Sequence, residues 1–217
     1  FSDDRVFDRE HPGYYLSFGT LCRETHLRQV SLSATGYYRT PGIWFDRDAG
    51  HGQPFYYFAY GMAVSEVVID TLTGAHRLLR TDILHDAGAS IDPVTDRGQV
   101  EGGFIQGVGW CTTEEIKWDE AGRLLTHSPD TYKIPTIGDI PYDFRVKFLE
   151  NAPNTGTIRG SKAVGEPPFM LGLSVWLAIK DAISAAGHHE TEPEFRLPAT
   201  GEVILEAVEK IVRPSRS

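Results

Sequence analysis

The pattern of hydrophobic and polar positions predicts little regular structure in the first quarter of the chain. Residues 5–8 are expected to form a short strand and, after a polar turn at residues 10–13, residues 18–29 a helix. Residues 31–57 are rich in Gly, Pro and Tyr, and this composition predicts an extended loop.

Most predicted strands lie in the middle of the chain. Residues 55–70 end in β-branched residues and predict a strand, and residues 75–85 are expected to pair with it after a Leu-Thr-Gly turn. A second hairpin is predicted from residues 114–118 and 123–126, and a further strand from residues 143–149.

Three helices are predicted in the second half. One covers residues 99–113, after a loop at residues 88–98. The clearest follows two prolines and ends before Gly187, because glycine commonly ends helices. The last covers Gly201–Val212. Hairpins and helices that mix without a βαβ alternation predict the α+β class.

Composition and charge exclude several functions. With 41% hydrophobic residues in 217, the chain can bury a core. Its net charge of −9 argues against a nucleic-acid or anionic-membrane partner, since both need clustered Lys and Arg. The two cysteines, Cys22 and Cys111, form no CxxC pair, so no metal ligand is predicted and a reducing, cytoplasmic location is expected.

The segment GSKAVGEPP, residues 160–168, holds a candidate for chemistry. The two prolines after Glu166 remove backbone donors and fix φ, so Glu166 is expected on a stiff turn at a helix N-terminus. Gly165 leaves open space beside it, which suits a general base. The alternative is that Glu166 only complements the helix dipole, by about 0.3–1 kcal/mol. Position alone favours this alternative.

The segment Gly98–Gly109 has five glycines in twelve residues, which is costly in a helix. Such a helix makes sense where another group packs tightly on its backbone. Gln99 and Gln106 lie near the glycine stripe, and their amides can orient a polar cofactor. Packing without a ligand explains the glycines best and the glutamines less well. The glycine spacing does not match the GxGxxG nucleotide fingerprint.

Together these segments resemble the xanthine dehydrogenases, within the molybdenum hydroxylases that also include the aldehyde oxidases. The similarity is to the C-terminal part of the molybdopterin-binding region. The matching stretches occur in the family's order and are residues 31–41, 81–93 (TDILHDAGASIDP), 98–109, 131–135 and 161–168 (SKAVGEPP).

The resemblance implies that Glu166 acts as the base at a molybdenum–molybdopterin centre and that Gln99 lies beside the molybdenum ligands. The implied reaction is hydroxylation of a purine, xanthine or hypoxanthine, with water as the oxygen source. Electrons would leave through 2Fe–2S clusters and FAD, held in other domains or subunits, to NAD. The implied partners are the remaining half of the molybdopterin domain, the iron–sulfur/FAD part and further copies in a homo-oligomer.

The residues that clamp the purine in this family lie upstream of the matched stretches. An aldehyde oxidase or another N-heterocycle hydroxylase would share Glu166 and Gln99, and a non-catalytic α+β module is a further alternative. Because the sequence begins with Phe1, we expect a piece of a longer chain that is inactive alone. We also expect the glycine-rich face of residues 98–109 to be left bare.

Overall fold

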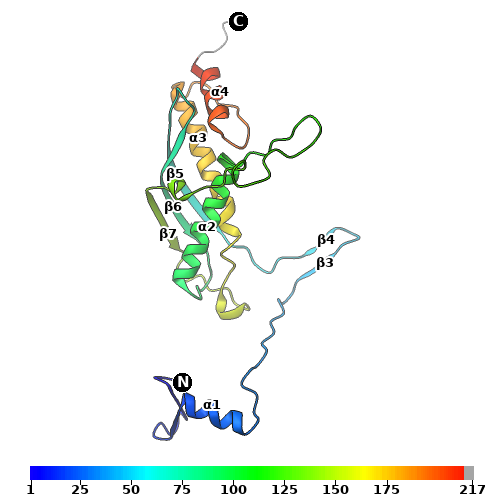
Figure 1. Cartoon of the computed structure of the whole chain (residues 1–217), viewed down its shortest axis with the longest axis vertical. Helices are drawn as coiled ribbons and strands as arrows, with labels where there is room; N and C mark the ends of the chain where they lie inside the picture. Colours follow the sequence, from blue (N-terminus) through cyan, green and yellow to red (C-terminus); the bar gives the residue numbers. More distant parts are fainter. Residues whose placement is uncertain (213–217) are drawn as a thin grey trace. The chain divides into compact units, whose positions relative to one another are not determined.

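The computed structural model describes residues 1–212 and divides into two compact units, the second of which begins at Thr40 (Figure 1). In the first unit, strands β1 (Arg5–Phe7) and β2 (Tyr15–Ser17) pair antiparallel. Helix α1 (Phe18–Leu27) follows directly, because the Ser17 hydroxyl accepts a hydrogen bond from Thr20 N at 3.1 Å and caps it. The predicted strand and helix are confirmed, whereas β2 was not predicted.

The second unit is built on a sheet with the strand order β5-β6-β7. Strands β5 (Gly61–Ile69) and β6 (His76–His85) form the predicted antiparallel hairpin. Strand β7 (Asp143–Phe148) pairs parallel to β6, and helix α2 (Pro93–Thr112) lies in the connection between them. The sheet therefore contains one βαβ crossover that the pattern did not predict, within a fold that is α+β as predicted.

Two predicted boundaries are wrong for local reasons. Strand β5 begins at residue 61 rather than 55. Helix α2 begins six residues early, because the Asp92 carboxylate accepts hydrogen bonds from Val94 N and Thr95 N and Pro93 supplies a preset first residue. The predicted loop therefore contains the first turns of this helix.

Two further predictions failed in irregular regions. Residues 114–126 form no hairpin strands and keep one isolated bridge, between Trp118 and Leu124. Conversely, the loop predicted over residues 31–57 contains a short hairpin, β3 (Trp44–Asp46) and β4 (His51–Gln53). Such three-residue strands carry too little alternation to be read from sequence.

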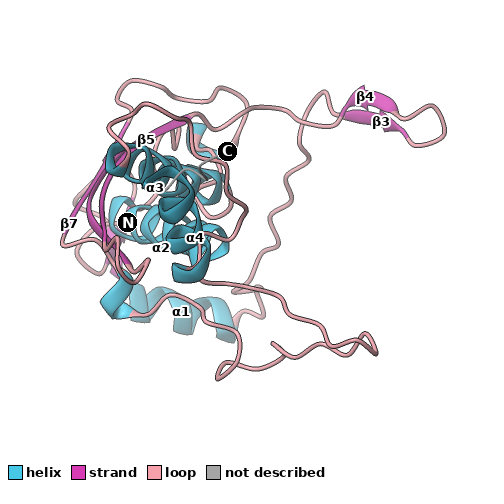
Figure 2. Ribbon diagram, turned by 90° about the horizontal axis from the view of Figure 1, so that it is seen from above, coloured by secondary structure: helices cyan, strands magenta, loops and turns pink. Residues whose placement is uncertain are grey.

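Helices α2, α3 (Leu173–Ala186) and α4 (Gly201–Val212) lie on one side of the three-stranded sheet (Figure 2). The strand residues that point to the helices are buried or half-buried, and those that alternate with them are half-buried or exposed. The hydrophobic core lies between the two layers. Its fully buried members come from all three helices and include Val100, Phe104, Val175, Ile179, Ile183 and Ile204.

The stretch Pro167–Ala186 is the one helical segment of the described residues long and apolar enough to cross a membrane by length and composition. The core helix of a globular domain passes the same test. Here Val175, Ile179 and Ile183 are fully buried in the core, and Lys180 forms an ion pair with Glu192. Packing against the sheet and α4 thus accounts for the apolar character of this segment.

Helix α2 packs at backbone contact on the short 3₁₀ helix η3 (Pro167–Gly172) that leads into α3. A Cβ on Gly103 would lie 2.6 Å from the Gly165 carbonyl oxygen, and one on Gly107 only 2.0 Å from that of Phe169. Gly103 and Gly107 thus serve close packing, the explanation that composition favoured. The expectation that this face is left bare was wrong for these two glycines, which η3 covers, whereas Gln99 and Gln106 beside them are exposed.

Gly107→Ala is expected to destabilise the protein by about 1–3 kcal/mol, because the new methyl group would overlap the backbone of Phe169. Gly102→Ala is the matched control in the same helix. A Cβ at Gly102 meets nothing within 4 Å, so this change should stabilise by up to about 1 kcal/mol. Urea unfolding of the two variants measures the difference, and equal effects would contradict the packing.

Candidate active site

Glu166 occupies the N-cap position of η3, with φ −87° and ψ −39°. Its backbone carbonyl accepts a hydrogen bond from Phe169 N at 3.0 Å, since Pro167 and Pro168 have no N–H to donate. Its side chain is exposed, does not cap the helix and makes no hydrogen bond or ion pair within residues 1–212. The backbone is fixed while the carboxylate stays available.

Gln99 lies in the second turn of α2 and is also exposed. Its Oε1 is 3.6 Å from where a Cβ on Gly165 would stand, so the amide lies beside the residue that precedes Glu166. Its carboxamide has no hydrogen-bond partner in the described part of the chain. The structure thus brings the segments of both predicted residues to one corner, where η3 begins against α2.

A buried ion pair below this corner was not predicted. Lys162 Nζ lies 2.5 Å from Asp86 Oδ2, and the two side chains are only 12% and 7% exposed. Burial alone would raise the pKa of Asp86, but hydrogen bonds from Lys162 and Gly88 N, with the Lys162 charge, lower it overall. No local signal singles out this pair, since the motif around Asp86 has three Asp residues and the partner, Lys162, lies in a different motif.

The segments that carry this pair are also joined through their backbones. Lys162 N donates to Ala87 O, and Ala89 N to Gly160 O, both at 2.8 Å. Gly88 has φ +62°, and a Cβ there would meet Gly160 O at 2.5 Å, so only glycine fits. The end of β6 is therefore fastened to the segment that leads to Glu166.

Two other residues of the matched stretches have structural contacts. Tyr132 Oη donates to Glu114 Oε2 at 2.7 Å, and Lys133 Nζ donates to Asp139 Oδ2 at 2.8 Å. Both side chains hold the irregular segment after α2 in place.

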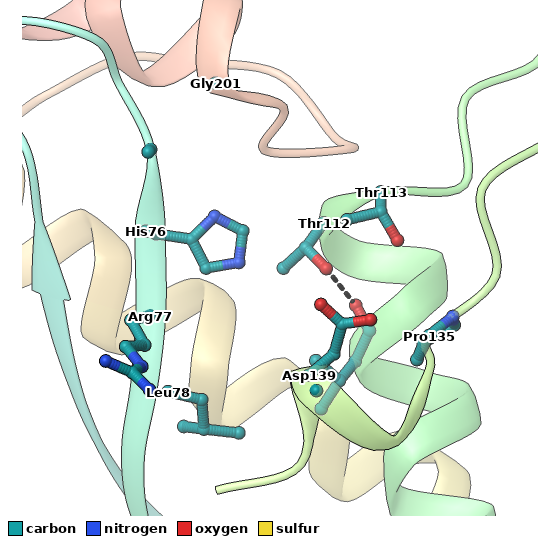
Figure 3. Close-up of a pocket in the computed structure, with 11 residues that line it drawn as sticks. His76, Arg77, Leu78, Thr112, Thr113, Pro135, Asp139 and Gly201 are labelled. Carbon is teal, nitrogen blue, oxygen red and sulfur yellow. Dashed lines mark hydrogen bonds between the residues drawn. The ribbon is translucent and has the colours of Figure 1, made fainter.

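A pocket of about 280 Å³ lies at the opposite end of α2 (Figure 3). His76 and Asp139 face its interior together with Thr112 (Figure 3). Burial lowers the pKa of His76, against the attraction of Asp139, while the Asp139 carboxylate already accepts hydrogen bonds from Lys133 and Thr136. The groups of this pocket are thus separate from the corner at Glu166.

Comparison with known proteins identifies the family of this chain. The family model of the molybdopterin cofactor-binding domain matches residues 1–141, which include Gln99 and Asp86. The chain belongs to this family. A xanthine dehydrogenase of Oryza sativa subsp. japonica is 49% identical over 203 residues, covering 88% of this chain and 15% of that protein. A xanthine dehydrogenase/oxidase of Felis catus is 52% identical over 188 residues, covering 84% and 14%.

This molybdopterin-binding chain thus spans about one seventh of those relatives. Among solved structures, an aldehyde oxidoreductase from Desulfovibrio gigas matches with a TM-score of 0.67 at 27% identity, over 86% of this chain and 20% of that one. A CO dehydrogenase from Oligotropha carboxidovorans shares the fold, with a TM-score of 0.68 at 21% identity, over 96% and 24%. The homologues are oxidoreductases of the molybdenum hydroxylase family.

The corner fits the polar edge of such a cofactor. Gln99 offers an NH₂ donor group and a carbonyl acceptor that no group of residues 1–212 uses, and Gly165 leaves room beside it. Among these described residues, no three His, Cys, Asp or Glu side chains gather to hold a metal ion.

The buried His85 next to Asp86 makes stability depend on pH. Its side chain is 1% exposed, and neither ring nitrogen has a hydrogen-bond partner in the described residues. Burial lowers the pKa of His85 overall, against the attraction of Asp86 and the nearby backbone of Ala163, and the Lys162 charge lowers it slightly further. The folded pKa then lies below the unfolded value of about 6.5. Stability should be fully present above that value and be lost as pH falls through it.

Urea unfolding between pH 7.5 and 5.5 tests this dependence. His85→Leu should flatten the pH dependence, because the buried group no longer titrates. His127→Gln, an exposed control, should leave the slope unchanged. An unaltered slope in His85→Leu would show that other groups carry the dependence.

Proposed function

We propose that this chain supplies the catalytic base and one cofactor contact of a molybdenum-dependent hydroxylase that oxidises xanthine or hypoxanthine. Water is the oxygen source and NAD the final electron acceptor. The observation that carries the proposal is the exposed, unpaired carboxylate of Glu166 on a fixed turn, with the free amide of Gln99 beside that turn. The purine and NAD specificity is supported by the resemblance to xanthine dehydrogenases at about 50% identity.

In this proposal Glu166 accepts the proton from the attacking oxygen as the new C–O bond forms. A base needs to be within reach of that proton and free of competing partners, and the exposed Glu166 carboxylate has no hydrogen bond or ion pair among residues 1–212. Gln99 would orient the polar edge of the cofactor through its amide. When bound, molybdenum–molybdopterin supplies the two-electron redox chemistry.

The proposed partners follow from the extent of the similarity. The relatives are about seven times longer than the matched segment, so the rest of the molybdopterin domain and the 2Fe–2S and FAD parts are proposed to lie elsewhere in the complete enzyme. We further propose that the complete enzyme is a homo-oligomer. Aldehydes are the competing substrate class, because the aldehyde oxidoreductase has the same fold.

Glu166→Gln in the complete enzyme should lower xanthine turnover by about 10²–10⁴-fold while the molybdenum content stays near that of the parent. The amide keeps the shape of the side chain and removes the base. Steady-state urate formation and metal analysis measure the two quantities. Glu202→Gln is the control, since Glu202 is an exposed carboxylate in the first turn of α4. Turnover of Glu166→Gln within threefold of the parent would refute the assignment. If the parent enzyme oxidises aldehydes and forms no urate, the substrate class is aldehydes rather than purines.

Gln99→Ala should reduce molybdenum content or turnover by about 10–100-fold, the usual effect of losing a group that orients a metal centre. Its melting temperature should change little, because the side chain is exposed and makes no protein hydrogen bond. Glu209→Ala, which removes an exposed polar side chain from α4, is the control. If Gln99→Ala only melts earlier and keeps its activity per molybdenum, the residue is structural.

A further inference from the structure

The segment before Glu166 is held by a buried cation. Lys162 stands four residues upstream, and its Nζ contacts Asp86 Oδ2 at 2.5 Å and Phe58 O at 2.9 Å. Asp86 is fixed in turn, because its Oδ1 accepts a hydrogen bond from Gly88 N at 2.9 Å. A buried charge that keeps its counter-charge and additional hydrogen bonds has one favourable position, so this contact sets where the Lys162 backbone lies.

The next residue is tied as well. Ala163 N donates to Tyr57 Oη at 2.9 Å. Beyond it, Val164 and Gly165 donate no backbone hydrogen bond among the described residues. The next fixed point is the Glu166 carbonyl, which caps η3. Glu166 therefore lies between two anchors, the packing of η3 on α2 downstream and the Lys162–Asp86 pair upstream.

We propose that Lys162, through Asp86, is a positioning residue that fixes the Glu166 carboxylate at the candidate active site. The proposal rests on the role of Glu166 given above. It requires no contact between Lys162 and the substrate or cofactor, since the ammonium is buried and already donates to the Asp86 carboxylate and the Phe58 carbonyl. A displacement of the base by about 1 Å can cost about 10²-fold in rate.

The test uses the complete enzyme with Lys162→Met, which keeps the aliphatic stem and removes the charge. Turnover should fall by about 10²-fold. Amide exchange at residues 162 and 163, whose N–H groups are hydrogen-bonded to Ala87 O and Tyr57 Oη, should become faster. Lys180→Met is the control, because it removes an ion pair of equal length, with Glu192, from α3 and should leave turnover unchanged. Unchanged exchange at residues 162 and 163 in Lys162→Met would overturn the proposed tether.

A second pair of variants distinguishes the loss of positioning from a loss of stability alone. Lys162→Met leaves Asp86 buried without its counter-charge, whereas Lys162→Met with Asp86→Asn removes both charges. The double variant should recover much of the melting temperature and still turn over slowly, because the tether is absent. Recovery of turnover together with stability would show that the pair is only structural and would overturn the proposal.

A double-mutant cycle with Glu166→Gln identifies the group through which Lys162 acts. If Lys162 works by positioning this carboxylate, Lys162→Met should change the residual rate of Glu166→Gln by less than about threefold. An undiminished 10²-fold loss would overturn the proposal. If Glu166→Gln alone keeps full turnover, the base assignment fails, and the exchange measurement still decides whether Lys162 fixes the segment.

Discussion

The structure of the second unit depends on one close contact between backbones, where α2 meets η3. Gly103 and Gly107 let the carbonyl groups of Gly165 and Phe169 approach to distances that no side chain would permit. Every larger residue there would push η3 away from the helix and carry Glu166 with it. Glycine is unfavourable within a helix, but here it permits the close packing of η3, and that packing fixes where the neighbouring segment lies.

This contact makes the corner a junction of three segments that are distant in sequence. The end of β6 provides Asp86, the second turn of α2 provides Gln99, and the turn before η3 provides Glu166. Each segment belongs to, or directly adjoins, a regular element whose opposite face is buried in the core. The corner thus gains rigidity from the sheet and helices rather than from its own loops.

The sequence predicted those parts of the fold whose cause is local. The β5–β6 hairpin, β7 and the ends of α3 and α4 follow from hydrophobic patterns and from Gly187 as a helix end. The start of α2 was placed wrongly because a capping side chain at Asp92 outweighed the glycines. The parallel pairing of β6 with β7 and the Lys162–Asp86 pair depend on residues far apart along the chain, which no local pattern encodes.

The Lys162–Asp86 pair joins residues that are 76 positions apart, whereas the β5–β6 hairpin closes over a short turn. Closing so long a loop costs more chain entropy, and its contacts form only after both segments have been ordered. The corner is therefore expected to assemble after the β5–β6 hairpin, because it needs the segments on both sides of α2 in place.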